Sequence, residues 1–203
     1  GLTSIGYGAF LYCDSLTSIT LPSSLTSIMN HAFDDCGGLT SITVEEGNPV
    51  YHSEGNCLIE TASNTLMRGC KNSVIPSYIT SIGDRAFYGC RGLTSITLPE
   101  GLTSIGYGAF YNCSGLKSIT LPEGLTSIGG SAFDYCSGLK EVIIDSEYVY
   151  TNATSKSACG YLLNYATTVK VLSSLVQENH EYINSTNFPN EIRIEGEYTV
   201  YSK

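Results

Sequence analysis

The sequence predicts an α/β solenoid that is rich in β-structure: short parallel strands, turns and short helical segments repeat along one axis, and a different region closes the C-terminal end. A phrase that reads LTSITLPEGLTSIGYGAFYNC in its clearest copy recurs with a period of 23 residues, and each copy ends in Phe-x-x-Cys. A fixed period of this length is typical of proteins in which each turn of chain stacks on the previous one. The five endings are Phe10/Cys13, Phe33/Cys36, Phe87/Cys90, Phe110/Cys113 and Phe133/Cys136.

The first strand of each turn is predicted from the alternation of apolar and polar residues. In the turn that begins at Leu93, Ile96 and Leu98 are expected to point inward, while Ser95 and Thr97 point to solvent. The proline that follows cannot continue a strand, and the next pair, Glu-Gly, reverses the chain. Equivalent strands of successive turns are therefore expected to form a parallel sheet.

The rest of the turn is predicted to hold a second apolar crossing and a short helical segment. Leu102 and Ile105 cross the far side, and the glycines that follow bend the chain. The segment 109–113 has the length of about one helical turn and directs Phe110 and Cys113 inward. One turn cannot bury this apolar set alone, so we expect like side chains to stack in columns, Phe on Phe and Leu on Leu.

Five of the eight cysteines occupy the same repeat position, which predicts a column of small buried thiols rather than a disulfide scaffold. Cys57 and Cys70 lie outside the pattern and are the pair to consider if any disulfide exists, while Cys159 stands alone. Zinc is not expected, because the chain has no C-x-x-C and no clustered histidines.

The solenoid is predicted over residues 1–145, with an irregular repeat at about 47–78. Two apolar runs, 57–59 and 65–67, flank a Thr-Ala-Ser-Asn turn, so we expect a β-hairpin that protrudes from the solenoid before 73–76 resumes the usual strand. Two interpretations stay open: an elongated repeat that accommodates extra length, or a contact feature on a regular scaffold.

Residues 146–203 are predicted to form a C-terminal cap. The pattern favours a helix over 156–165, a further parallel strand over 169–172, and a final pair of strands over 192–194 and 198–201. A solenoid leaves its last strand edge open unless something covers it, and an open edge promotes aggregation. Covering that edge is the role we expect for this region.

At the repeat positions the sequence resembles the BspA-like leucine-rich repeat family, whose motif is L-x-x-I-x-L-P-x-x-L-x-x-I-x-x-x-A-F-x-x-C. The match is full or nearly full at Leu16–Cys36, Leu93–Cys113 and Leu116–Cys136, and partial at Leu2–Cys13 and Ile79–Cys90. The resemblance covers roughly residues 1–145. It implies a leucine-rich-repeat solenoid in a secreted or surface-anchored protein that binds host proteins, and it brings no catalytic residues.

Composition argues against several classes of partner. The net charge is −9 and no basic stripe exists, which excludes nucleic acid and an anionic membrane surface as expected partners. No run of about 18 apolar residues could span a bilayer. Charged residues make up only 14% of the chain, and a surface of hydroxyl groups is typical of extracellular proteins. Because Gly1–Ile5 matches Gly101–Ile105, we also expect an excised piece of a longer protein.

Motifs for catalysis are not found. The chain has no Walker-type phosphate loop, no G-x-S-x-G and no H-E-x-x-H. We therefore expect no enzyme, no cofactor and no metal, unless His31, His52 or His180 lies within reach of an acid and a Ser or Cys. The adjacent Asp34 and Asp35 are expected to lie on a solvated surface rather than to bind calcium.

Two surfaces are candidates for binding. Outward strand positions form a face of short hydroxyls, represented by Ser95, Thr97, Ser118 and Thr120. Tyrosines gather on the loop side of the turns, at Tyr7, Tyr12, Tyr88, Tyr107, Tyr111 and Tyr135. Interface hot spots favour Trp, Tyr and Arg, so the tyrosine side is the better candidate.

These observations predict a non-enzymatic interaction module that is extracellular or on the cell surface and binds a protein partner, in the manner of an adhesin. Two alternatives remain open from the sequence. One is a module that binds carbohydrate or cell wall, since tyrosines and hydroxyls would serve a glycan. The other is a structural spacer that displays another domain.

Overall fold

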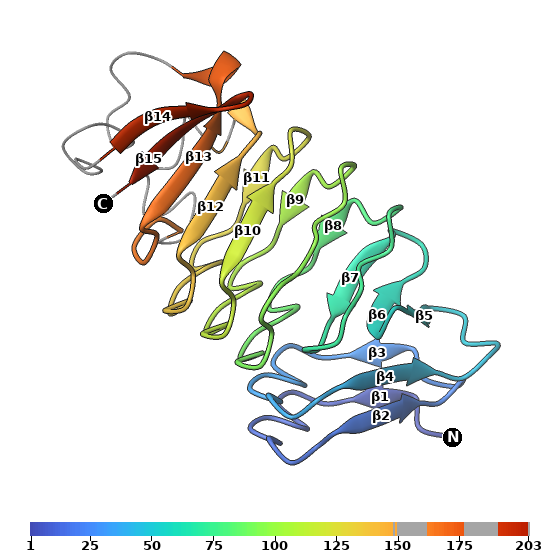
Figure 1. The fold of residues 1–203 in the computed structure, drawn as a ribbon. Coiled ribbons are helices and arrows are strands. Elements are labelled where there is room, and N and C mark those ends of the chain that lie inside the picture. The colour runs from blue at the N-terminus through green and yellow to red at the C-terminus, as the bar shows by residue number, and fades with distance from the viewer. Residues whose placement is uncertain (148, 150–161, 177–190, 203) are drawn as a thin grey trace.

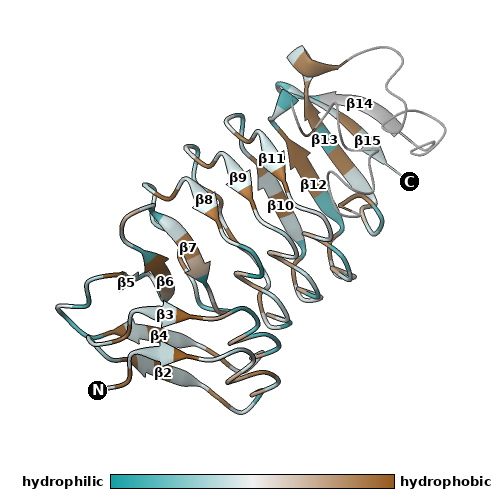
Figure 2. Ribbon diagram, turned by 180° about the vertical axis from the view of Figure 1, so that it is seen from behind, coloured by the Kyte–Doolittle hydropathy of each residue, from teal (hydrophilic) through white to brown (hydrophobic). Residues whose placement is uncertain are grey.

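The computed structural model describes residues 1–147, 149, 162–176 and 191–202. The chain winds into an elongated coil of short strands, with the N-terminus and the C-terminal strands at opposite ends (Figure 1). The strands form separate stacks that run along the coil. Hydrophobic residues recur at the same place in successive turns, as the ends of β8, β9 and β11 show in Figure 2.

The N-terminal strands confirm the stacking that the repeat predicts. They are β1 (Ser4–Ile5), β2 (Ser18–Leu21), β3 (Ser27–Ile28) and β4 (Ser41–Val44). Strand β1 pairs in parallel with β3, and β2 with β4, so that Ser4 lies opposite Ser27 and Ser18 opposite Ser41. In each case the partner is the equivalent residue of the next repeat, 23 positions later. The period of the sequence therefore sets the register of strand pairing.

Two larger sheets follow. The first, in the order β11-β9-β8-β7-β6-β5, comprises β5 (Tyr51–Glu54), β6 (Cys57–Glu60), β7 (Thr65–Arg68), β8 (Ser81–Ile82), β9 (Ser104–Ile105) and β11 (Ser127–Ile128). The second, in the order β10-β12-β13-β15-β14, comprises β10 (Ser118–Leu121), β12 (Glu141–Ile144), β13 (Thr168–Leu172), β14 (Glu191–Glu195) and β15 (Tyr198–Ser202). Both continue the parallel stacking through the regular repeats.

The irregular repeat forms a hairpin, but the hairpin does not protrude. Strands β6 and β7 pair antiparallel, and β7 then pairs in parallel with β8, so the hairpin is part of the six-stranded sheet. Three consecutive residues of β6 are buried because the strand is covered on both faces. Leu58 belongs to an apolar core with the N-terminal repeats, whereas Cys57 and Ile59 belong to the core of the later repeats. The hairpin therefore joins two cores, and strands β1–β4 lie across the direction of the later strands (Figure 1).

Two predicted strands are absent from the described chain. Neither segment 73–76 nor segment 93–98 forms a hydrogen-bonded β-strand. The Val74 amide donates to the carbonyl of Gly55 and the Ser73 hydroxyl to that of Asn56, so this segment follows the β5–β6 turn instead of strand β4. The next repeat consequently has no strand to pair with on that side, and the parallel ladder resumes at β10.

The predicted helical turn in each repeat is wrong, and with it the α part of the α/β assignment. The amides of Tyr111 and Cys113 bond locally to carbonyls three residues earlier, whereas those of Phe110 and Asn112 donate to Ala132 and Asp134 in the next repeat. A helix cannot form when alternate amides bond between turns. Residue 112 is also left-handed, with a φ of 56°, which ends any helical run. Helix is nearly absent from the described residues, where η1 (Ser173–Leu175) is a 3-10 turn.

The predicted side-chain columns are present. Phe87 and Phe110 stack with ring centroids 5.0 Å apart, and Phe110 and Phe133 at 5.3 Å. Phe10 and Phe33 form a separate stack in the N-terminal core. The described cysteines are free thiols, Cys57 and Cys70 included, and four of the five repeat cysteines are buried. Cys159 lies outside the described residues.

The C-terminal region adds strands to the last repeat. Strand β13 pairs in parallel with β12, as predicted, and β15 and β14 follow antiparallel around the turn at Gly196. The predicted helix over 156–165 lies mostly outside the described residues, and its last four residues form turns and bends. That the region serves as a cap remains a prediction. No helix within the described ranges has the length and apolar character needed to cross a bilayer.

Candidate interaction surface

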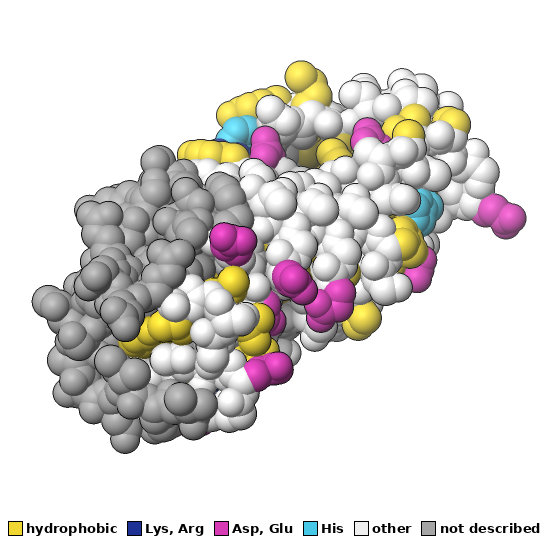
Figure 3. Space-filling model, turned by 90° about the horizontal axis from the view of Figure 1, so that it is seen from above, with side chains coloured by type: hydrophobic (Ala, Val, Ile, Leu, Met, Phe, Trp, Pro, Cys, Tyr) yellow, Lys and Arg dark blue, Asp and Glu magenta, His cyan; other side chains and the backbone are white. Residues whose placement is uncertain are grey.

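The strand side carries exposed hydroxyl groups at the four candidate positions. Ser118 and Thr120 project from β10 and are exposed, and Ser95 and Thr97 are exposed on the irregular segment before it. Figure 3, a view from above, shows acidic side chains scattered over a surface that is otherwise largely white, the colour of the backbone and of uncharged polar side chains. These four residues present short hydroxyl groups, and none of them has a large side chain that could fill a pocket on a partner.

The tyrosine side carries larger groups. Tyr7, Tyr12, Tyr107 and Tyr135 are 67%, 69%, 49% and 58% exposed, and Tyr88 and Tyr111 are half-buried. The structure does not bring all six together. Tyr7 and Tyr12 lie on the N-terminal repeats, whereas the other four follow one another on the later repeats.

These four form what we call the tyrosine row: Tyr88, Tyr107, Tyr111 and Tyr135. The rings of Tyr88 and Tyr111 stack at 4.5 Å with an interplanar angle of 5°, and Tyr111 meets Tyr135 at 5.1 Å in a tilted contact. The Arg85 guanidinium lies 4.7 Å from the ring centre of Tyr88 and 5.4 Å from that of Tyr107. Stacking and cation–π contacts thus hold the row in place.

The hydroxyls of Tyr88 and Tyr111 remain protonated at neutral pH. Burial raises the pKa of Tyr111 to about 12, and the neighbouring Tyr88 and Tyr135 add to this effect. Burial also raises the pKa of Tyr88, against the opposing influence of Arg85. Each phenol can therefore donate as well as accept a hydrogen bond.

The two apolar cores meet beside the tyrosine row, and we call the place where they meet the junction. Ion pairs connect the two cores there. Arg85 Nη1 lies 2.9 Å from Asp34 Oδ2, which His31 Nδ1 also contacts at 2.8 Å. Arg91 Nη2 lies 3.2 Å from Asp35 Oδ1. The prediction that Asp34 and Asp35 lie on a solvated surface is therefore wrong: both are buried, because the bend after the irregular repeat places them against the arginines of the next regular repeat.

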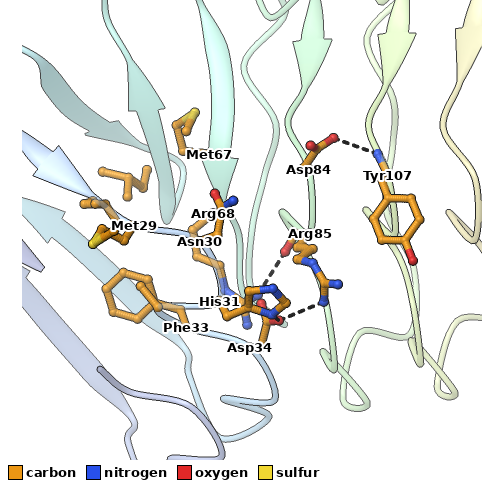
Figure 4. A pocket seen from close by; sticks show the side chains of 13 residues that line it. Met29, Asn30, His31, Phe33, Asp34, Met67, Arg68, Asp84, Arg85 and Tyr107 are labelled. Atoms are coloured by element: carbon orange, nitrogen blue, oxygen red, sulfur yellow. Dashed lines mark hydrogen bonds and ion pairs between the residues drawn. The ribbon is translucent and has the colours of Figure 1, made fainter. Parts of the chain in front are cut away.

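A pocket of about 220 Å³ opens at this junction (Figure 4). We call it the junction pocket. Its apolar wall includes Ile28, Met29 and Met67, and its polar wall includes Asp34 and Arg85, with Tyr107 at its border. Residues from both cores line the pocket. The pocket therefore exists because the repeat is interrupted between the two cores.

Arg68, at the end of β7, is a buried cation beside the pocket. Its exposed fraction is 3%, and its guanidinium donates to the carbonyl oxygens of Arg85 and Tyr88. Its Nε has no hydrogen-bond partner. Across the described residues no carboxylate oxygen lies within ion-pair distance of Arg68, and the groups that accept from it are neutral: two carbonyl oxygens and Cys90 Sγ.

The described histidines do not form a nucleophilic site. His31 contacts the carboxylate of Asp34 and the ring of Tyr7, and no Ser or Cys completes the arrangement. His52 contacts the hydroxyls of Thr61 and Tyr78. His180 lies outside the described residues. In the part of the chain that the structure describes, no group of three His, Cys, Asp or Glu side chains could hold a metal ion.

Sequence reasoning missed the junction residues, although a signal was present. In the last repeat before the interruption, both of these adjacent positions are acidic, Asp34 and Asp35. The equivalent pairs in the other repeats hold at most one Asp and are otherwise Leu, Tyr, Asn or Gly. In the first regular repeat after it, Arg85 and Arg91 break the pattern with the opposite charge. Acidic substitutions in the repeat before an interruption and basic ones in the repeat after it indicate that the two repeats are in contact.

The chain matches a family model described as BspA type leucine rich repeat region, in six copies over residues 1–61 and 59–183. This match confirms the resemblance that the repeat motif carries. Comparison with curated proteins gives no match.

Two solved structures are similar. One is a leucine-rich repeat protein from Eubacterium ventriosum, with 25% sequence identity and a TM-score of 0.67 over 89% of this chain and 49% of that one. The other is a leucine rich cell surface protein from Faecalibacterium prausnitzii, with 28% identity and a TM-score of 0.52 over 72% of this chain and 53% of that one. The chain therefore spans about half of the length of these relatives.

Proposed function

Because the chain belongs to the BspA-type leucine-rich repeat family, we propose that it is a non-enzymatic interaction module of a secreted or cell-surface protein. It binds a protein partner through the tyrosine side, in the manner of an adhesin. The surface location is supported by the likeness to the Faecalibacterium prausnitzii protein, which is described as a cell surface protein.

The observation that carries this proposal is the packing of the tyrosine row. The residues that precede Tyr88 and Tyr111 in the chain, Phe87 and Phe110, are buried and stacked on each other. The ring of Tyr111 is in contact with tyrosines on both sides. Side chains that are already ordered lose little freedom on binding, and Tyr is among the residues that dominate binding energy at interfaces.

The same geometry favours a protein over a carbohydrate. A sugar ring binds an aromatic side chain by lying against an open face of the ring. Tyr88 and Tyr111 cover each other's faces, since their rings are almost parallel at 4.5 Å, and Arg85 lies over a face of Tyr88. Ring edges and hydroxyls are what these tyrosines present to solvent, and a protein surface can match such a strip by hydrogen bonds and apolar contacts.

The experiment compares two faces of the protein against the same probes. Wild type, a tyrosine-side variant (Tyr111→Ala with Tyr135→Ala) and a strand-face variant (Ser118→Ala with Thr120→Ala) are applied to an array of purified extracellular proteins and to a glycan array. Thermal unfolding of each variant checks that the fold is intact.

We expect wild type to bind at least one protein, the tyrosine-side variant to lose that binding, and the strand-face variant to keep it. Binding to glycans alone would identify a carbohydrate module instead. Binding to neither array would favour a spacer, and equal binding by all three proteins would reject the tyrosine side as the interface.

A further inference from the structure

The junction pocket is a concave feature next to the tyrosine row, whose Tyr107 lines it. Its border includes Tyr107, and the exposed ring of Tyr7 lies 4.9 Å from His31, another residue of the lining. Exposed large side chains therefore flank the pocket from both cores. A pocket flanked by two tyrosines, with Arg and Met in its walls, has the composition of an interface hot spot.

One wall of the pocket suits an apolar side chain. Met29 is 55% exposed, although large apolar side chains of the regular repeats are almost all buried, and Met67 lines the same wall from β7. Methionine is flexible and polarizable, so such a wall adapts to the shape of the group that it receives.

The other wall suits an anion. The Arg85 guanidinium contacts Asp34 through one nitrogen, and its side chain keeps 22% of its surface exposed, so further N–H donors remain for a second acceptor. His31 holds the Asp34 carboxylate from the other side and so fixes the position of the ion pair. Arginine binds carboxylates in a planar, two-point geometry that lysine cannot reproduce.

Two arginines and two aspartates line the pocket: Arg68, Arg85, Asp34 and Asp84. The net charge of the chain is −9, yet four of its ten Lys and Arg residues fall between positions 68 and 91, with a single acidic residue, Asp84, among them. Asp34 and Asp35 pair with two of these cations. The buried Arg68 has no such pair, and a charge held away from water acts on its surroundings with little screening.

We propose that the junction pocket receives an acidic side chain of the protein partner, with the carboxylate on Arg85 and a neighbouring apolar side chain against Met29 and Met67. The site rests on the proposed function, because it places the anchor of the partner beside the tyrosine row. The recognised chemistry is thus a polypeptide segment in which Asp or Glu stands next to an apolar residue.

The test uses a displayed library of random linear peptides, selected on the wild-type protein, followed by titration calorimetry with the best synthetic peptide. The matched peptide has Asn or Gln in place of its acidic residue. Two variants address the pocket: Arg85→Gln removes the guanidinium, and Met29→Glu places a like charge on the exposed wall without disturbing a buried ion pair. Arg91→Gln is the control, since Arg91 also pairs across the junction but does not line the pocket.

We expect the selection to enrich acidic residues beside apolar ones. Arg85→Gln, Met29→Glu and the amide peptide should each weaken binding about tenfold or more, while Arg91→Gln binds like wild type. If Arg85→Gln fails to fold, Met29→Glu and the amide peptide decide the result.

Three outcomes overturn the proposal: no enrichment of acidic peptides, binding that is insensitive to the pocket variants, or binding of free glucuronic or N-acetylneuraminic acid without binding of peptides. A protein partner that depends on Tyr111 and Tyr135 but not on Arg85 or Met29 would refute this site and leave the proposed function intact.

Discussion

The thiol of Cys136 donates a hydrogen bond to the carbonyl oxygen of Phe110, one repeat earlier, with an Sγ–O distance of 3.0 Å. Cys113 makes the same contact with Phe87 at 3.2 Å. The conserved spacing of Phe and Cys within each repeat is therefore also a contact between repeats. The Phe110 carbonyl also accepts from the amide of Cys113, so the thiol is a second donor to it, and a small side chain fits this buried site.

Replacing Phe110 by Ala should destabilise the protein strongly. The ring is fully buried between Phe87 and Phe133, so its removal leaves a cavity in the column. We expect the free energy of unfolding to fall by about 3–5 kcal/mol, measured by equilibrium denaturation. Phe10→Ala is the control, because Phe10 is half-buried and has one stacking partner, and it should cost less. A loss below about 1 kcal/mol for Phe110→Ala would contradict the column.

The junction predicts unequal costs for two neighbouring carboxylates. Asp34→Asn removes a buried charge that pairs with both His31 and Arg85, and should lower the free energy of unfolding by about 1–3 kcal/mol. Asp35→Asn should cost less than about 1 kcal/mol, since its partner Arg91 is mostly solvated. Denaturant titrations of the two variants give the comparison. Equal effects would mean that the Asp34 pair does not connect the cores.

Gly69 should not accept a side chain. A Cβ at this position would lie 2.1 Å from Cε1 of Phe87, which is itself fixed in the phenylalanine column. Gly69→Ala is expected to lower the free energy of unfolding by about 1–3 kcal/mol through overpacking. Gly101→Ala provides the comparison, because no atom lies within 4 Å of its Cβ position. The prediction fails if the two substitutions shift the unfolding midpoint equally.

The buried thiols predict a loss of stability at high pH. Burial raises the pKa of Cys136 to about 12 and that of Cys90 to about 11, from an ordinary value of 9.0. In the unfolded chain the thiols ionise near 9.0, so the unfolded state releases protons first. The contribution of the protonated thiols to the free energy of unfolding is therefore fully present below about pH 9 and decreases from pH 9 toward pH 12. Cys136→Ala should reduce this slope in unfolding experiments, and an unchanged slope would show that the thiol does not titrate as described.

Much of the fold follows from the sequence because one repeat specifies it many times. The columns of Phe and Cys, the register of β1 with β3 and the strand at 169–172 are all consequences of like residues meeting at equal spacing. The helical turns were predicted wrongly from segment length alone. Bonding of alternate amides between repeats decides that conformation, and a single repeat read in isolation does not reveal it.

The junction could not be predicted in the same way, because it arises where the repeat fails. The hairpin was expected to protrude, but β6 is apolar at three consecutive positions, which is the pattern of a strand covered on both faces. The six candidate tyrosines are exposed or half-buried, and their role in binding stays a prediction. Their division into a row of four and a separate pair depends on the bend, which only the three-dimensional structure provides.

Hydrogen–deuterium exchange of the protein, with and without a protein captured on the array, tests the interaction through the tyrosine side most directly. We predict that binding slows exchange in the segments around 107–112 and 131–135, which carry Tyr107, Tyr111 and Tyr135, and leaves strands β10 (118–121) and β12 (141–144) unchanged. Slowed exchange in those strands alone, with the tyrosine segments unaffected, would contradict it.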